Sequence, residues 1–379
     1  MSGSAGMKRH IRLSKASLSE AEIEAAIRPL RNEYLGMGME VRAFEEELSA
    51  YLGRPVACVV NGTAALHLAL QGLGIGAGDE ILVPSLTYVA SFQAISATGA
   101  IPVACDIDPN TCTLSVSDLR KRITDRTKAV MPVHYAGNVG HLDEIYELST
   151  GHGLRVVEDA AHAFGTIHHG RPVGASGDIA CFSFDGIKNI TSGEGGCIVS
   201  SDEKLMNAVR DARLLGVEHD TTARYAGSRS WDFDVKAQGW RYHMSDIMAS
   251  IGRVQLARRA ELASRRQYLA ASYITRLSGN ARIRPVLQGF TAIVPHIFPI
   301  RIAGLGDRDA LRARMRERGI ETGVHYRPNH TLSLYKQHIR FPLPVTESVY
   351  PELLTLPLHP DLTDEDISYV ALSLIDELS

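Results

Sequence analysis

Between about residue 55 and residue 200, short apolar runs alternate with longer amphipathic stretches. The apolar runs have the length of strands and end in glycine or polar residues, whereas the amphipathic stretches have the apolar spacing of helices. Because the runs contain few polar positions, both faces of each strand should be covered. This pattern predicts an α/β fold with a mostly parallel sheet flanked by helices. The predicted strands are residues 56–60, 80–85, 101–107, 129–135, 155–161, 179–184 and 196–201, and the predicted helices 63–74, 88–99, 118–123 and 142–153.

The pattern changes after about residue 245. Residues 246–277 are rich in alanine and arginine and have helical periodicity throughout. Two domains are expected from a chain of 379 residues. We therefore predict a large domain over residues 1–250, including the N-terminal segment. Residues 251–379 should form a bridging helix and a smaller C-terminal α/β domain.

Composition and charge exclude several classes of protein. The chain is 45% hydrophobic and carries a formal net charge of −3, without the clustered basic face that nucleic-acid binding requires. Its five cysteines are scattered, so neither a disulfide framework nor a zinc site is expected.

The remaining features predict no metal site and no membrane segment. His168 and His169 are predicted to form a polar surface turn rather than a metal-binding pair. The N-terminus lacks an apolar signal segment, and no run reaches the roughly 18 apolar residues of a membrane span. The predicted location is the cytoplasm.

The first candidate for chemistry is the turn after the strand that ends at Val60. Asn61 and Gly62 form the turn, and a helix is expected to begin at Thr63 or Ala64. Free N–H groups at a helix start bind phosphate, and a glycine allows close approach of the backbone. An ordinary capped helix explains the same residues, so this segment alone is a weak signal.

The second candidate is Asp159, directly beyond a predicted strand. A carboxylate in that position needs a positive partner, such as the protonated pyridine nitrogen of pyridoxal phosphate (PLP). Glu158 precedes it and should point to the opposite face if the strand continues. The alternative is that Asp159 caps a helix over residues 160–164.

The third candidate is Lys188, in a glycine-rich loop between two apolar strands. A partly buried lysine has a lowered pKa, which an imine-forming amine requires. Ser183 precedes it and offers a hydroxyl group to a phosphate. Taken alone, the segment is better explained as a hairpin with a surface lysine.

The three candidates follow one another in the chain in the order found in fold-type I PLP enzymes: a turn that binds phosphate, an aspartate at a strand end and a lysine in a loop. Asp159 and Lys188 are only 29 residues apart. From about Leu13 to the C-terminus the chain resembles the DegT/DnrJ/EryC1/StrS family of sugar aminotransferases. The resemblance is carried by NGTAALHLALQGLGIGAGDE, VPSLTYVASFQAISATGAIPVACDID, MPVHYAG, LPLHPDLTDEDISYV and, most specifically, EDAAHAFG and KNITSGEGG.

The resemblance implies a PLP-binding site in which different residues bind different parts of the cofactor. Lys188 would form the imine with the cofactor aldehyde and later move a proton between cofactor carbon and substrate carbon. Asp159 would pair with the pyridine nitrogen. The phosphate would be held by Gly62, Thr63, Ser183 and the start of the helix at Ala64.

Further residues would complete the site. Tyr88 would stack on the pyridine ring, and His162 occupies the position near the ring hydroxyl, with a histidine on a helix face as the less favoured alternative. His325 and Tyr326 correspond to the mouth of the sugar site and are candidate substrate contacts.

One segment departs from the family pattern. The usual G-x-N-Y-R-M segment is GWRYHM here, from Gly239 to Met244. The family asparagine contacts the cofactor phosphate from the neighbouring subunit. Arg241 in its place is expected either to bind that phosphate or to bind the diphosphate of a nucleotide sugar. His243 replaces the family arginine and is given no role.

The resemblance also implies an activity. An amino group would pass from L-glutamate through PLP to a keto-sugar. The resemblance favours a nucleotide-linked 4-keto-6-deoxy sugar, because KNITSGEGG is closer to family members acting at C4 than to those acting at C3. Amination at C3 or of a cyclitol ketone stays open. A PLP-dependent sugar dehydratase would have histidine in place of Lys188, and a DNA-binding regulator would need a basic stripe. A homodimer with shared active sites is expected.

Overall fold

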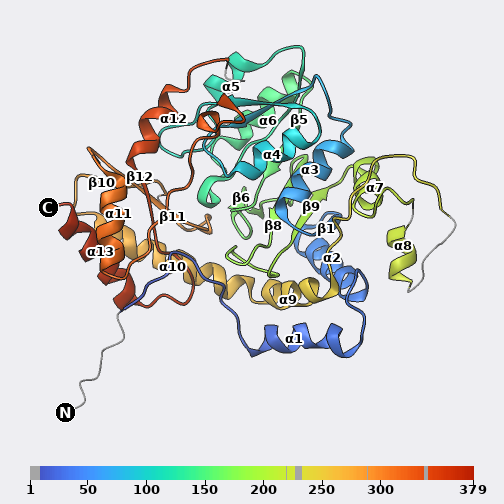
Figure 1. The fold of residues 1–379 in the computed structure, drawn as a ribbon, viewed down its shortest axis with the longest axis horizontal. Coiled ribbons are helices and arrows are strands. Elements are labelled where there is room, and N and C mark those ends of the chain that lie inside the picture. The colour runs from blue at the N-terminus through green and yellow to red at the C-terminus, as the bar shows by residue number, and fades with distance from the viewer. Residues whose placement is uncertain (1–8, 219, 227–232, 288, 337–339) are drawn as a thin grey trace.

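A seven-stranded sheet forms the centre of the molecule (Figure 1). The computed structural model describes residues 9–218, 220–226, 233–287, 289–336 and 340–379. The strand order is β1-β9-β8-β5-β4-β2-β3, and only β9 runs against its neighbours. The predicted α/β fold with a mostly parallel sheet is confirmed. The strands are β1 (Val56–Val59), β2 (Glu80–Pro84), β3 (Ile101–Cys105), β4 (Thr127–Val130), β5 (Arg155–Asp159), β8 (Ile179–Ser183) and β9 (Gly196–Ser200).

Both faces of this sheet are covered by helices. In β1, Ala57 and Val59 face one core cluster, while Val56 and Cys58 face another. Apolar residues at every position therefore reflect burial on both sides. The helices of this part are α1 (Glu20–Arg31), α2 (Met39–Leu52), α3 (Gly62–Gly72), α4 (Val89–Ala97), α5 (Val116–Arg122), α6 (Leu142–Gly151), α7 (Glu203–Ala212) and α8 (Asp220–Tyr225).

The C-terminal part is built on a three-stranded antiparallel sheet. Its strands are β10 (Ile283–Pro285), β11 (Phe298–Ile302) and β12 (Leu353–Leu356), and its helices α11 (Arg308–Glu317), α12 (Pro344–Val349) and α13 (Asp364–Glu377). Ile11 packs in the same core and pairs with Ile320, so the N-terminal segment reaches this part of the molecule.

The long helix expected over residues 246–277 consists of two helices that meet at Arg258. These are α9 (Asp246–Ala257), which packs on α1 and α2, and α10 (Arg259–Leu277), whose apolar face belongs to the C-terminal core. Figure 1 shows α9 and α10 end to end, leading from beside the large sheet to β10–β12. A domain division near residue 250 stays a prediction.

The topology gathers the candidate residues at one edge of the large sheet. In parallel strands the carboxyl ends lie at the same edge, where open α/β sheets bind ligands. β1 leads to Gly62, β2 to Tyr88, β5 ends at Asp159 and β8 ends at Ser183. Among the described residues, no helix is both long and apolar enough to cross a membrane.

Candidate active site

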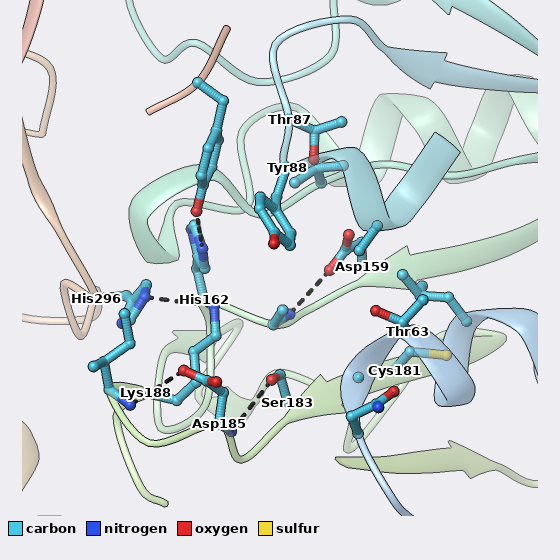
Figure 2. A pocket seen from close by; sticks show the side chains of 18 of the residues that line it. Thr63, Thr87, Tyr88, Asp159, His162, Cys181, Ser183, Asp185, Lys188 and His296 are labelled. Carbon is cyan, nitrogen blue, oxygen red and sulfur yellow. Dashed lines mark hydrogen bonds between the residues drawn. The ribbon is translucent and has the colours of Figure 1, made fainter. Parts of the chain in front are cut away.

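A cavity of about 430 Å³ opens at this edge of the sheet. In the view of Figure 2, Lys188 and Asp159 lie on opposite sides of it, with Tyr88 between them. The structure thus brings together residues from four strand ends and from the C-terminal part. The sequence-predicted residues that line the cavity are Gly62, Thr63, Tyr88, Asp159, His162, Ser183, Lys188, His325 and Tyr326.

The start of α3 offers a small anion site. Asn61 is the N-cap, and its side-chain oxygen accepts a hydrogen bond from Ala64 N at 2.8 Å. The Ala64 N–H is therefore already bonded, and Ala64 does not line the cavity, which differs from the expectation that it would hold the phosphate. The helix also begins one residue earlier than expected. Gly62, Thr63 and the Ser183 hydroxyl are left facing the cavity.

Gly62 is required by a close approach of two chain segments. A Cβ at this position would lie 2.8 Å from Ser183 Cβ and 3.2 Å from its Oγ. Only glycine lets the α3 start and the end of β8 come this close. The hydroxyl group and the helix start then face one anion together.

Asp159 is held in place by two hydrogen bonds. Ser91 Oγ donates to Asp159 Oδ2 at 2.7 Å, and Ala161 N donates to Oδ1 at 3.2 Å. The helix that Asp159 was alternatively expected to cap does not form, since residues 160–165 consist of turns and irregular backbone. Asp159 is 6% exposed and lines the cavity, so its carboxylate is available to a cationic group there.

Glu158 points away from the cavity, as the alternation along a strand requires. Its Oε2 lies 2.7 Å from His134 Nε2, and Tyr146 Oη donates to its Oε1 at 2.6 Å. Two adjacent carboxylates thus have separate surroundings. One belongs to the site and the other to a buried polar network behind it.

Lys188 lies in the loop between β8 and β9, but it is not a surface residue. Burial lowers the pKa of Lys188 to about 8, while Asp159 and Asp185 act in the opposite direction. Its Nζ is 3.5 Å from Nε2 of His296. A lysine with this pKa is neutral more often near neutral pH than an ordinary lysine, and the neutral amine is the form that attacks a carbonyl.

His162 and Tyr326 form a hydrogen-bonded pair at the cavity wall. Burial holds the pKa of His162 well below its usual value, so the ring is neutral. Ala136 N donates to His162 Nδ1 at 3.3 Å, which places the ring proton on Nε2, 2.9 Å from Tyr326 Oη. His162 lies in a turn rather than on a helix. The Tyr326 hydroxyl proton is then free for a ligand.

Tyr88 and His325 complete the upper part of the site. Tyr88 is 58% exposed, although its ring lies against that of Tyr326, with centroids 5.6 Å apart. An aromatic face left open toward the cavity suits stacking on a cationic heterocycle. Burial lowers the pKa of His325 to about 4, and its Nδ1 is 2.8 Å from Thr355 Oγ1.

Several lining residues were not found from the sequence. His296, Asp185 and Glu194 all line the cavity, and Ser91 holds Asp159 from behind. Only His296 had a visible signal, a single histidine within the apolar segment IVPHIFPI. Its neighbours across the cavity come from distant segments, so the sequence could not show its role.

Arg241 lies outside the cavity of its own chain. It is exposed and pairs through its backbone with Leu214. Within one chain, the structure therefore does not place Arg241 beside Gly62, Thr63 and Ser183, the other residues expected to bind the cofactor phosphate. His243 pairs with Val59, and burial lowers its pKa to about 4.

His168 and His169 were expected to form no more than a surface turn. His168 Nε2 is 3.0 Å from Asp143 Oδ1, and His169 Nε2 is 2.7 Å from Asp143 Oδ2. The three side chains place possible ligand atoms within 4.8 Å of one another. The sequence did not indicate Asp143, which precedes these histidines by 25 and 26 residues.

The residues of the cavity fit PLP. The start of α3 at Gly62 and the Ser183 hydroxyl offer an anion site, the Asp159 carboxylate faces the cavity, and a lysine with a lowered pKa stands on the opposite side. Phosphate, pyridine nitrogen and aldehyde would each meet a matching group. Fold and site together define a PLP-dependent enzyme.

The chain belongs to the DegT/DnrJ/EryC1/StrS aminotransferase family, whose sequence model matches residues 16–375. It is therefore a PLP-dependent aminotransferase.

Solved structures share the fold over nearly the whole chain. The aminotransferase TlmJ from Streptoalloteichus hindustanus is 34% identical, with 97% of this chain and 98% of that chain covered and a TM-score of 0.89. The putative sugar aminotransferase Spr1654 from Streptococcus pneumoniae, in its PMP-form, is 31% identical, with 97% and 99% covered and a TM-score of 0.89. Helicobacter pylori PseC, an aminotransferase involved in the biosynthesis of pseudoaminic acid, is 26% identical, with 97% and 99% covered and a TM-score of 0.90.

Proposed function

We propose that this aminotransferase moves an amino group from L-glutamate to a keto-sugar, with Lys188 and Asp159 as the residues that hold the reactive ends of the cofactor. The similarity to sugar aminotransferases supports the class of acceptor. The observation that carries the proposal is the placement of a lysine of pKa about 8 and a buried carboxylate on opposite sides of one cavity.

PLP, when bound, supplies a ring that accepts the electrons of the bond broken at the amino-bearing carbon. Asp159 would hold the proton on the ring nitrogen, and Ser91 keeps its carboxylate oriented. Gly62, Thr63 and Ser183 would bind the phosphate. The Lys188 amine would take a proton from the donor carbon and return it in the second half of the reaction.

Tyr88 would cover the ring and exclude water from one face. His162 would lie near the ring hydroxyl, with its Nε2 proton donated to Tyr326 Oη. His325 and Tyr326, at the wall formed by the C-terminal part, would contact the sugar.

The acceptor is proposed to be a nucleotide-linked 4-keto-6-deoxy sugar. The KNITSGEGG segment around Lys188 supports amination at C4, whereas a C3 ketone or a cyclitol ketone is the alternative. Arg241 would bind a phosphate group from the neighbouring subunit of a homodimer. Its exposure on its own chain is compatible with this, and the cytoplasm is the proposed location.

The substrate is tested with a panel of nucleotide-linked amino sugars added to the PLP form of the enzyme. The sugar that converts bound PLP into pyridoxamine phosphate, followed by absorbance, identifies the position of the amine. Labelled glutamate should transfer its nitrogen to the product. Loss of a sugar hydroxyl without nitrogen transfer would indicate a dehydratase instead, and Lys188→Ala with full turnover would refute the role of Lys188.

A further inference from the structure

Arg266, on α10, is a buried arginine that binds only backbone oxygens. It is 2% exposed, and burial lowers its pKa to about 10. Nη1 donates to the carbonyl oxygens of His296 at 3.1 Å and Leu358 at 3.4 Å. Nη2 donates to those of Ile187 and Lys188, each at 3.4 Å. One guanidinium group thus joins the lysine loop to two segments of the C-terminal part.

The absence of an acidic partner distinguishes Arg266 from Arg213, which is also fully buried. Arg213 forms an ion pair with Glu45. Among the described residues no carboxylate forms an ion pair with Arg266, and its Nε has no hydrogen-bond partner. An unpaired buried charge lowers the stability of a fold. A buried residue that lowers the stability of the fold in this way is a candidate for a role in function.

His296 connects this arginine to the lysine amine. The His296 carbonyl accepts from Arg266, while the ring of the same residue lies 3.5 Å from Lys188 Nζ. The ring also packs against His162, with centroids 4.4 Å apart. Burial holds the pKa of His296 well below its usual value, and the positive charges of Lys188 and Arg266 lower it further. A neutral imidazole is a hydrogen-bond acceptor for a lysine N–H.

We propose that Arg266 is a positioning residue for Lys188: by binding the carbonyl oxygens of Lys188 and His296 with one guanidinium group, it keeps the lysine amine against the His296 ring and directed into the cavity. The charge of Arg266 also adds to the effect of burial in lowering the pKa of this amine. The inference rests on the proposed role of Lys188 as the residue that bonds the cofactor aldehyde.

The test uses apoprotein, so that it does not depend on turnover. The rate at which Lys188 is acetylated by trace acetic anhydride is followed by peptide mass spectrometry as a function of pH. Wild-type protein should show a midpoint near pH 8, the pKa of the buried amine. Arg266→Met removes the charge and the four hydrogen bonds, and should raise the midpoint by about one pH unit because a nearby like charge is lost.

Arg265→Met is the matched control. Arg265 lies on the same helix and also donates to two backbone oxygens of the C-terminal part, those of Pro360 and Leu362, but not to the lysine loop. It should leave the Lys188 midpoint unchanged. An unshifted midpoint in folded Arg266→Met, or an equal shift in Arg265→Met, would overturn the proposal.

Arg266→Lys keeps the charge but replaces the planar group with a single ammonium, which cannot bind all four oxygens in the same geometry. Its Lys188 midpoint should stay near wild type, whereas PLP capture, followed by absorbance, should slow by about tenfold because the amine is less well placed. Wild-type capture by this variant would contradict the proposal even if Arg266→Met does not fold. A separate experiment distinguishes failure of the proposed function from failure of this proposal. If a Lys188→Ala protein still carries covalently bound PLP after borohydride reduction, another lysine bonds the cofactor aldehyde.

Discussion

At the scale of single residues, strand alternation divides two adjacent carboxylates between two tasks. Asp159 faces the cavity and accepts from Ser91 and Ala161, while Glu158 accepts from Tyr146 and pairs with His134 on the other side of the strand. The chemistry of the side chains is nearly the same. Their functions differ because of what each one faces.

Asp159→Asn should therefore impair the cofactor chemistry without unfolding the protein. The amide keeps an acceptor for Ser91 but cannot neutralise a protonated ring nitrogen. We expect kcat to fall by about a hundredfold, which is the about 3 kcal/mol typical of a broken buried charge pair. Steady-state kinetics, with the absorbance spectrum of bound PLP, would measure it.

Glu158→Gln is the matched control for that substitution. It places an amide N–H₂ against either His134 or Tyr146, where a carboxylate oxygen stood, so the free energy of unfolding should fall by about 1–3 kcal/mol. The PLP spectrum should stay that of the wild type. The reverse outcome, in which Glu158→Gln alters the spectrum and Asp159→Asn leaves kcat intact, would show that the ring nitrogen pairs with Glu158 and not with Asp159.

At the scale of elements, the site depends on how α3 meets the end of β8. Asn61 caps the helix through Ala64 N, and Gly62 lets Ser183 approach from the neighbouring strand. The helix start alone would be an ordinary cap. The contact between the two elements turns it into a site for an anion.

Gly62→Ala should weaken PLP binding, since the new Cβ would lie 2.8 Å from Ser183 Cβ and force the helix start and the strand apart. We expect the Kd of PLP to rise by about tenfold, a loss of about 1.4 kcal/mol. Equilibrium titration followed by absorbance would show this. Gly151→Ala in α6, where nothing lies within 4 Å of the added atom, is the control and should leave the Kd unchanged.

At the scale of the whole molecule, buried neutral histidines make stability depend on pH. Burial holds the pKa values of His162 and His296 well below normal and lowers that of His325 to about 4. The unfolded chain takes up these protons at about pH 6.5, whereas the folded protein does not. Acid therefore favours the unfolded state over the window from about pH 6.5 downward.

The Tm of the apoprotein should accordingly fall as the pH is lowered from about 7 to about 5. At about pH 5, His325 alone should lower the free energy of unfolding by about 2 kcal/mol. Calorimetry at a series of pH values measures it. Replacement of His325 by Gln should reduce the slope. A Tm that is constant over this window would show that these rings are protonated in the folded protein as readily as in the unfolded chain.

The proposed homodimer can be tested by mixing two inactive variants. If Arg241 serves the site of the neighbouring subunit, refolding Lys188→Ala together with Arg241→Ala produces mixed dimers with one intact site each. Random pairing should restore about a quarter of the wild-type activity. No recovery, in a mixture shown by sedimentation to be dimeric, would place Arg241 outside the shared site.

The sequence by itself determined the elements of the large sheet and the order of the chemical groups. Uninterrupted apolar runs can be buried only between two layers of helices, so the α/β class could be predicted from local pattern. Asp159 and Lys188 could be named because polar groups at strand ends and in glycine-rich loops are conspicuous against apolar neighbours. The sequence also predicted the opposite directions of Glu158 and Asp159, which follow from the two-residue repeat of a strand.

Only the tertiary structure decided which distant residues meet. His296 and Arg266 lie far from Lys188 in the chain, and no local pattern relates them to it, yet they touch its amine and its carbonyl oxygen. The bonding of the Ala64 N–H to Asn61 and the separation of Arg241 from its own cavity were decided in the same way. Local sequence sets the conformation of a segment, whereas the packing of segments determines the partners of each polar group and hence the pKa of the lysine.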